Sequence, residues 1–382
     1  MSPDDVVAEQ GHAAAVFGAT GLPFVGLTLA GDGAWSARFW ERSAPRIYNR
    51  HWCSSVRVVG ERLAMSYMDR LAPRPKTTGM QVRTISAWGE TCQADLARLR
   101  VGLVGAGSVG GFVGEALART GFERITVIDF DTIEEHNLDR LVYATPADVG
   151  RLKAATLAER LKVIATAARF EVETVGKAVF EEEGFRAALD CDVLISCVDR
   201  PWGRHALNFI AFAHLIPVID GGIHVRVNRS GKLAAADWRA ITTAPGRACL
   251  ECLGQYSSGL VQTEREGNLD DPTYIDGLPA GHPLKARENV FGFSMACASL
   301  QTLQLLALSI APLGRANQGA QRYHFVGGFM EPATFSDCDA ACLFPSLIAK
   351  GDSSGFRVTG QRPVKPAPTP SIPNSAAARS KQ

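Results

Sequence analysis

Residues 101–110 read Val-Gly-Leu-Val-Gly-Ala-Gly-Ser-Val-Gly, and they carry the strongest indication of the fold. Its first half is a short apolar run that predicts a buried strand over 101–105, and its glycines form the pattern GxGxxG. We predict that Gly105 permits a tight turn, that Gly107 lets the backbone approach a phosphate, and that Gly110 lets a following helix pack on the sheet. The start of that helix would offer free backbone N–H groups to an anion.

The same alternation of short apolar strands and helical stretches continues on the C-terminal side. Further strands are predicted at 125–129, 170–175, 192–197 and 216–220. Helical stretches separate the first five strands, which is the signature of a parallel sheet. After Asp220 a hairpin is predicted, with its turn at Ser230-Gly231. We therefore predict an α/β fold with a Rossmann-like, doubly wound and mostly parallel sheet.

Three zones follow from the composition along the chain. Residues 1–80 form a small, irregular α/β region, and residues 81–346 form the nucleotide-binding domain. Residues 347–382 are polar and proline-rich, so we predict a disordered tail there.

The overall balance of residues excludes several classes of protein. The 382 residues include 40 basic and 39 acidic side chains, so no basic excess points to a nucleic-acid or membrane partner. The apolar stretch Phe293 to Leu313 is interrupted by Gln301, Thr302 and Gln304, which predicts a buried helix instead of a membrane span. The N-terminus lacks a secretory pattern, and nine cysteines are an odd number, so we expect a reducing cytoplasm.

Charged residues on the C-terminal side of the glycine motif limit which reactions the site could catalyse. Asp129 ends the second strand, 24 residues after Gly105, where a carboxylate can accept hydrogen bonds from a ribose. A nicotinamide-dependent dehydrogenase would explain that much. It would leave Arg140, Lys153 and Asp199 without roles, although fixed cations suit the binding of a polyanion and the charge that develops on a phosphate.

Three segments carry a resemblance to a known family. They are IDFDTIEEHNLDR at 128–140, VGRLKA at 149–154 and ISCVDRPWGRHALN at 195–208. These segments resemble the ThiF/MoeB/HesA family of adenylating enzymes, which includes the activating enzymes for ubiquitin-like proteins. The resemblance implies that the chain binds ATP with Mg²⁺ and adenylates the C-terminal glycine carboxylate of a ubiquitin-like or sulfur-carrier protein.

The resemblance also implies roles and partners. Asp129 would bind the ribose, Asn137 the phosphates, and Asp199 the Mg²⁺ ion. Asp131 would lie near the nucleotide, and Arg140 and Lys153 would supply positive charge. The expected partner is a small β-grasp carrier protein, and a conjugating enzyme or an isopeptidase could act in the same pathway.

The segment before the first strand resembles the family's RYxRQ lead-in. The matching arginine is Arg83, although Thr84 stands in place of the usual glutamine. In homodimeric members this arginine reaches the γ-phosphate of ATP in the partner subunit. The resemblance therefore implies a homodimer in which Arg83 acts across the interface.

Two pairs of cysteines have the spacing of metal ligands. Cys249 and Cys252 form CxxC, and Cys338 and Cys342 form Cx3C. Four thiolates suit a closed, tetrahedral and structural zinc site. The alternative is that the cysteines bind no metal and are two pairs of ordinary buried thiols.

A catalytic cysteine is not expected. The loop candidate of an additional thioester step, residues 255–288, contains no cysteine. Cys297 is predicted to lie in the core, and Cys297, Cys92 and Cys53 are weak thioester candidates. We therefore predict adenylation without a thioester step.

Residues 21–40 and 54–63 resemble the second half of a JAB/JAMM isopeptidase domain. Such a domain needs HxH and SxxD to bind zinc, and only an SxxD, Ser2 to Asp5, is present. We do not expect isopeptidase activity. A misplaced start would predict an in-frame upstream stretch that encodes HxH.

Three rival functions remain open. The first is an NAD(P)-dependent Rossmann oxidoreductase, and the second is a non-catalytic subunit of an activating enzyme. The third is a cyclase that adenylates a tRNA-linked or peptide carboxylate.

Overall fold

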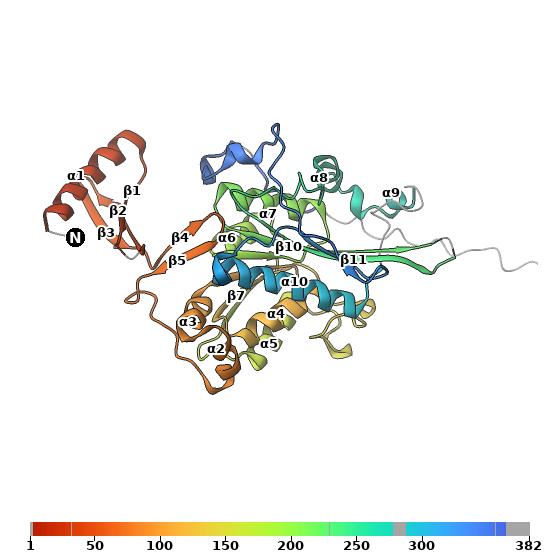
Figure 1. Ribbon diagram of the computed structural model, residues 1–382. Helices are drawn as coiled ribbons and strands as arrows, with labels where there is room; N and C mark the ends of the chain where they lie inside the picture. The colour runs from red at the N-terminus through yellow and green to blue at the C-terminus, as the bar shows by residue number, and fades with distance from the viewer. Residues whose placement is uncertain (1–2, 32, 229, 278–287, 356, 364–382) are drawn as a thin grey trace, which may run out of the picture.

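The computed structural model describes residues 3–31, 33–228, 230–277, 288–355 and 357–363. Its centre is an eight-stranded sheet in the order β13-β12-β11-β10-β9-β6-β7-β8 (Figure 1). The parallel half consists of β6 (Arg100–Val104), β7 (Arg124–Ile128), β8 (Glu171–Val175), β9 (Val193–Ser196) and β10 (Val218–Val227). The antiparallel half adds β11 (Leu233–Thr243), β12 (Gln321–His324) and β13 (Phe329–Met330).

The five predicted strands and the hairpin are confirmed. Strands β6, β7 and β9 are short, apolar and buried, and they pair in parallel because a helix follows each of them. The chain moves outward from β6 to β7 and β8, and then returns to place β9 on the other side of β6. This reversal between β6 and β9 is the point at which open α/β sheets bind ligands.

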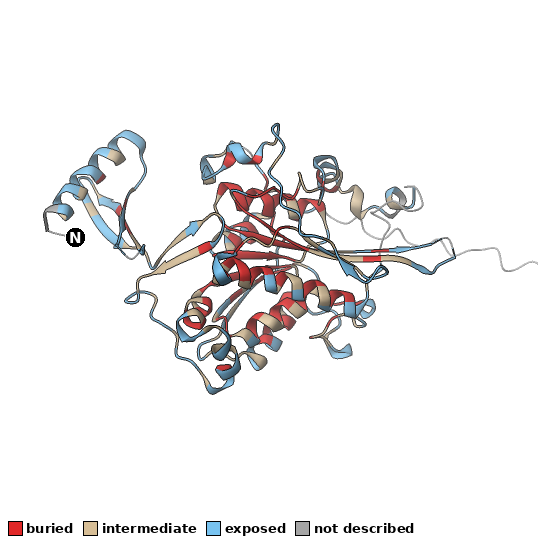
Figure 2. Ribbon diagram, viewed as in Figure 1, coloured by how far each residue is buried: buried red, intermediate tan, exposed pale blue. Residues whose placement is uncertain are grey.

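Helices cover both faces of the sheet, as Figure 1 shows. One face carries α6 (Glu182–Leu189) and α7 (Pro201–Ala213). The other carries α3 (Glu90–Arg98), α4 (Ser108–Thr120), α5 (Lys153–Ile164) and α10 (Phe291–Ile310). The buried residues concentrate between these layers (Figure 2). They form two apolar cores, one on each face of the sheet.

Helix α10 confirms the predicted buried helix. Among the described residues it is the one helix that is long and apolar enough to cross a membrane, but it lies against β10, β11 and α4. Gln301, one of the polar residues that interrupt the apolar stretch, forms hydrogen bonds inside the protein. Its side-chain amide donates to the carbonyls of Ser196 and Ile219 at 2.8 and 3.1 Å. A buried amide with two such bonds stabilises the strand ends that it joins.

The N-terminal region stands apart from the main sheet (Figure 1). Helix α1 (Pro3–Thr20) packs on a sheet of β1 (Phe24–Leu29), β2 (Trp35–Ala44) and β3 (Ile47–Trp52). The hairpin β4 (Ser55–Val59) and β5 (Leu63–Tyr67) and helix α2 (Val82–Trp88) lead from it to α3. A buried ion pair between Glu9 and Arg38 joins α1 to β2.

The described part of the predicted tail is ordered. Trp202 donates from its indole N–H to the carbonyl of Val358 at 2.9 Å, and the amide of Gly360 donates to the carbonyl of Phe180 at 2.8 Å. Val358 is buried against the same core as α7. Residues 347–355 and 357–363 therefore pack on the body, in contrast to the predicted disorder from residue 347. Residues 364–382 lie outside the described residues.

Candidate active site

The glycine loop lies between β6 and α4, at the point where the sheet reverses direction. Gly105 has a φ of +95°, and a Cβ there would meet the carbonyl oxygen of Cys197 at 2.7 Å. A Cβ on Gly110 would lie 1.9 Å from the carbonyl oxygen of Gly105. A side chain at position 105 would therefore push the loop away from the end of β9, and one at position 110 would collide with the backbone of the loop itself. Gly107 has open space around its α-carbon and precedes the first residue of α4, so an anion can approach the N–H groups there.

Asp129, which follows β7, fastens this loop. Its carboxylate accepts from the amide of Ala106 at 2.5 Å and from the amide of Asp131 at 2.7 Å. Burial, with Asp131 nearby, raises the pKa of Asp129 to about 6. The group is therefore mostly ionised at neutral pH, and it is fixed as a hydrogen-bond acceptor beside the loop.

Lys153 and Asp131 close the site on the side of α5. Lys153 is the first residue of α5, and its Nζ lies 2.9 Å from the Asp131 carboxylate. The backbone amide of Lys153 also donates to the carbonyl of Asp131 at 2.9 Å. This double connection holds the ammonium group at the carboxyl end of β7.

Asn137 and Arg140 lie on the segment that follows β7, where Asn137 ends the 3₁₀ turn Glu135–Asn137. Asn137 is buried, and its side-chain oxygen accepts from the amide of Glu134 at 3.0 Å. Arg140 bonds locally to the carbonyl of His136 at 2.5 Å and to Asp139 at 2.8 Å. The contacts of both residues are local, so their predicted roles toward phosphate stay predictions.

Asp199 follows β9 and is exposed. Arg204 on α7 positions this loop: one of its nitrogens donates to the carbonyl of Asp199 at 3.5 Å, and its Nε donates to Asp220 at 3.1 Å. An exposed carboxylate at the end of a strand is a suitable oxygen ligand for Mg²⁺. The residue types present thus fit the predicted cation.

Three residues of this network lie outside the sequence-based prediction: Arg204, Asp220 and Arg239. Asp220 is fully buried in β10 and also accepts from the Ser196 hydroxyl at 2.7 Å and from Arg239 at 3.2 Å. Burial lowers the pKa of Arg239 to about 10. Arg204 lies five residues after Asp199, and Asp220 ends the predicted strand at 216–220, so their positions could have marked each residue as a candidate, although not the contact between them.

Arg83 lies away from these groups. It is exposed on α2, and the structure gives its side chain no ion pair among the described residues. The following turn is anchored by Gln93, which accepts from the Trp88 indole at 3.0 Å and donates to the carbonyl of Thr120 at 2.8 Å. The role of Arg83 across a dimer interface stays a prediction.

The segment after the first cysteine pair, residues 255–289, begins by packing on the N-terminal end of α7. Glu264 on α8 (Ser258–Arg265) is buried and accepts from the amide of Trp202 at 2.7 Å. Arg200 and Asp270 form an ion pair of 2.8 Å beside it. At the far end of the segment, beyond α9 (Pro272–Gly277), Asn289 donates to the Ser108 hydroxyl at 2.8 Å. Both ends of the segment therefore contact the active-site loops, while residues 278–287 lie outside the described residues.

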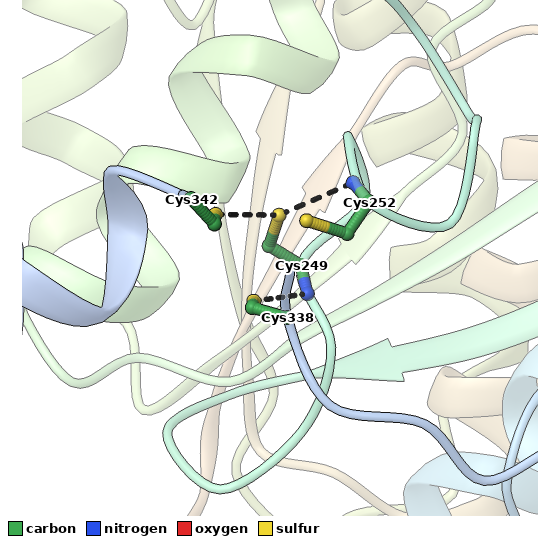
Figure 3. Close-up of side chains that lie close together, drawn as sticks. All are labelled: Cys249, Cys252, Cys338 and Cys342. Atoms are coloured by element: carbon green, nitrogen blue, oxygen red, sulfur yellow. Dashed lines mark hydrogen bonds between the residues drawn. The ribbon is translucent and has the colours of Figure 1, made fainter. Parts of the chain in front are cut away.

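The four predicted zinc ligands come together (Figure 3). The sulfur atoms of Cys249, Cys252, Cys338 and Cys342 all lie within 4.8 Å of one another. Backbone amides of Cys249, Cys252 and Asp339 donate to cluster sulfurs at 3.2, 3.4 and 3.4 Å. Such N–H···S bonds stabilise thiolates, so the cluster fits a structural zinc ion.

The three weak thioester candidates differ from this cluster. Cys297 is fully buried in α10 and burial raises its pKa to about 12. Cys53 and Cys92 are half-buried, and burial raises the pKa of each thiol. An attacking thiolate needs a lowered pKa and access, and none of these residues has both.

Comparison with known proteins now assigns the family. The sequence profile of the ThiF family matches residues 79–330. The chain belongs to the ThiF family. Its fold also matches the crystal structure of Escherichia coli MccB with ATP at a TM-score of 0.52, with 17% identity over 70% of this chain and 74% of that one. At that identity the match concerns the fold alone.

Two curated relatives show how far the ThiF similarity extends. Ubiquitin-like modifier-activating enzyme 5 of Drosophila simulans is 30% identical over 204 residues, which span 47% of this chain and 50% of the relative. Molybdopterin-synthase adenylyltransferase of E. coli is 26% identical over 163 residues, which span 43% and 61%. The chain therefore spans about half the length of these relatives. The resemblance of residues 1–80 to a JAB/JAMM domain gains no support, since the ThiF match begins at residue 79.

Proposed function

We propose that this ThiF-family chain is an adenylyltransferase that activates the C-terminal carboxylate of a small ubiquitin-like or sulfur-carrier protein. The observation that carries the proposal is the convergence of three strand ends at the reversal of the sheet. Gly105 follows β6, Asp129 follows β7 and Asp199 follows β9, and hydrogen bonds or close backbone contacts join all three segments. The named activities of the two relatives support the same reaction class.

In the proposed reaction the substrate carboxylate is already a nucleophile, so no general base is required. One of its oxygens forms a bond to the α-phosphorus of ATP while the bond from that phosphorus to the bridging oxygen breaks. Pyrophosphate leaves, and the carrier becomes an acyl-adenylate. Asp129 would accept from the ribose, and the N–H groups at the start of α4 would face the phosphates.

Fixed positive charge would assist the departure of pyrophosphate. Lys153, held by Asp131, and Arg140 would oppose the negative charge that develops on the phosphates. Asp199 would hold Mg²⁺, which neutralises phosphate charge when it is bound. Arg204 would keep the Asp199 loop in place through its bond to Asp220.

The decisive experiment is ATP–pyrophosphate exchange in the presence of a small β-grasp protein that ends in glycine. We expect Lys153→Ala and Asp199→Ala each to reduce exchange by roughly a hundredfold or more, because each removes charge stabilisation at the phosphates. Lys162→Ala, which alters an exposed lysine on the same helix, is the matched control. Full exchange in both site variants would show that the site is misassigned.

The alternative of a nicotinamide-dependent oxidoreductase makes the opposite prediction for nucleotide binding. ATP, and not NAD, should compete for the site, because the ThiF assignment and the Lys153 ammonium favour a triphosphate. Competition by NAD at lower concentration than ATP would favour the oxidoreductase.

A second substrate class has specific support. A segment of 81 residues is 40% identical to tRNA threonylcarbamoyladenosine dehydratase of E. coli, although it spans only 21% of this chain and 30% of that enzyme. The same adenylation step could act there on a tRNA-linked carboxylate. Exchange that requires tRNA and ignores β-grasp proteins would select this alternative.

We further propose a cytoplasmic homodimer in which Arg83 completes the partner's site. Arg83 is exposed on α2, and no ion pair engages its side chain among the described residues, which supports a role across an interface. Mixing Arg83→Ala with Lys153→Ala should restore partial exchange, because one hybrid site then has both residues intact. A mixture that stays inactive while dimers re-form would argue against this role.

A further inference from the structure

A second cavity lies at the other side of the domain, between the end of β11 and the cluster of four cysteines. Its volume is about 200 Å³. Its wall contains two charged residues, Arg247 and Asp337. The other lining residues are polar or apolar, among them Thr242, Leu253, Asn317, Phe335 and Ser336. The predicted adenylation residues are absent from this wall.

Arg247 is the unusual member of that wall. It is only 8% exposed, yet its partners are neutral: the Asn317 side-chain oxygen at 2.8 Å and the carbonyl of Glu61 at 2.7 Å. Its Nε is buried without a hydrogen-bond partner. Within the described chain no carboxylate lies within ion-pair distance of Arg247. Burial lowers its pKa to about 10, although the negative charge of Glu61 nearby acts in the opposite direction.

Such a buried guanidinium is costly without an anion. A buried charge is normally compensated by an opposite charge and by bonds to its remaining donors. Arg239 shows the compensated arrangement in the same domain, because it pairs with the buried carboxylate of Asp220 at 3.2 Å. Arg247 has no carboxylate in direct contact among the described residues, so an anionic group in the cavity would supply the pairing that Arg239 already has.

The backbone holds Arg247 in place in advance of any ligand. The residue lies in a tight turn in which its amide donates to the carbonyl of Ala244 at 3.0 Å. The next residue donates from its amide to the carbonyl of Ser336 at 3.0 Å, and its own carbonyl accepts from the Thr243 hydroxyl at 3.0 Å. A fixed arginine in a small cavity with mixed walls is typical of a site that orients one anionic group.

We propose that this cavity binds a small molecule or peptide end through a carboxylate group held by Arg247. We choose a singly charged carboxylate over a phosphate dianion because Asp337 also borders the cavity. The negative charge of Asp337 would repel a dianion more strongly than it would repel a carboxylate. The carboxylate could belong to a free organic acid or to the C-terminus of a peptide. This site is separate from the proposed adenylation site and does not depend on it.

Ligand-observed NMR on the full chain tests the proposal with N-acetylglycine, benzoate and an acetylated tetrapeptide. N-acetylglycine amide, which lacks the carboxylate, is the matched control ligand. We expect the acids to bind and the amide not to bind. Binding of the tetrapeptide alone would identify a peptide end as the source, and binding of the small acids as well would identify free acids. No binding of any acid, or equal binding of acid and amide, would overturn the proposal.

Two variants locate the site. Arg247→Gln should weaken acid binding roughly ten- to a hundredfold, as expected for the loss of a charge-assisted hydrogen bond. Ser336→Trp should block binding by filling the cavity while Arg247 stays, so the test survives if Arg247→Gln does not fold. Arg315→Gln, at an exposed arginine, is the control. Unchanged binding in Ser336→Trp would overturn the location. Exchange of ATP and pyrophosphate should persist in all three variants, which separates this proposal from the adenylation proposal.

Discussion

The carboxyl edge of the sheet and the cluster of four cysteines are two polar centres built in opposite ways. In the cluster, four sulfur atoms face one another within 4.8 Å, and backbone amides donate to the sulfurs from outside. At the sheet edge, charged groups hold one another in place but still face solvent, as with Lys153 and Asp131, whose side chains are 13% and 49% exposed. A closed centre can stabilise the fold, whereas an open one can receive a substrate.

The largest effect should follow from breaking the closed centre. If the cluster holds zinc as predicted, Cys249→Ser should abolish zinc binding by the purified protein and lower the free energy of unfolding by roughly 5 kcal/mol, because a zinc ion held by the four cysteines would join two segments far apart in the sequence. Metal analysis and urea unfolding measure both quantities. Cys92→Ser, at a half-buried thiol outside the cluster, should change neither. Full stability without bound metal in Cys249→Ser would contradict the structural role.

The next effect concerns the charges beneath the open centre. Asp220→Asn leaves Arg204 and Arg239 without their shared buried carboxylate, so we expect a loss of about 3–5 kcal/mol in the free energy of unfolding. Glu182→Gln, which breaks the exposed pair with Arg186, should cost less than about 1 kcal/mol. Equal losses in the two variants would show that burial does not distinguish these pairs.

The smallest effect is a pH dependence of the free energy of unfolding, which we expect from Glu264 beside the Asp199 loop. Burial raises the pKa of Glu264 to about 7, above its ordinary value of 4.5. The folded state therefore binds this proton more tightly, so the contribution of Glu264 to stability is greatest below pH 4.5 and is lost as the pH rises through 7. Its size is at most about 3 kcal/mol.

Glu264→Gln keeps an oxygen that can accept from Trp202 but removes the titration. Urea unfolding at pH 5 and pH 8 should therefore show a smaller difference in the variant than in the parent. Glu266→Gln, at an exposed position one residue beyond α8, should leave the difference unchanged. If both variants keep the full pH dependence, another group is responsible.

Much of the open centre was predictable because its residues follow regular elements. The GxGxxG pattern is a local motif, and Asp129 and Asp199 can be placed at strand ends because the strands are recognisable as short apolar runs. The parallel sheet then brings these strand ends to one edge. The partners of Arg204 were not predictable, since its bonds to Asp220 and Gly221 depend on where α7 packs against β10. The ordering of Val358 and Gly360 was missed for the same reason, because a polar and proline-rich segment gives no periodic signal for its contacts with Trp202 and Phe180.

The sheet, the glycine loop and the two cysteine pairs follow from the sequence alone, because residue types at short spacing encode each of them. Which charged side chains have a charged partner depends on how the chain packs. Arg239 and Arg247 lie eight residues apart and look alike in the sequence, yet one faces a buried carboxylate and the other faces a cavity. The reason is physical: a charge is stabilised by whatever chain packing brings within a few ångströms, and that packing joins residues that are distant along the chain.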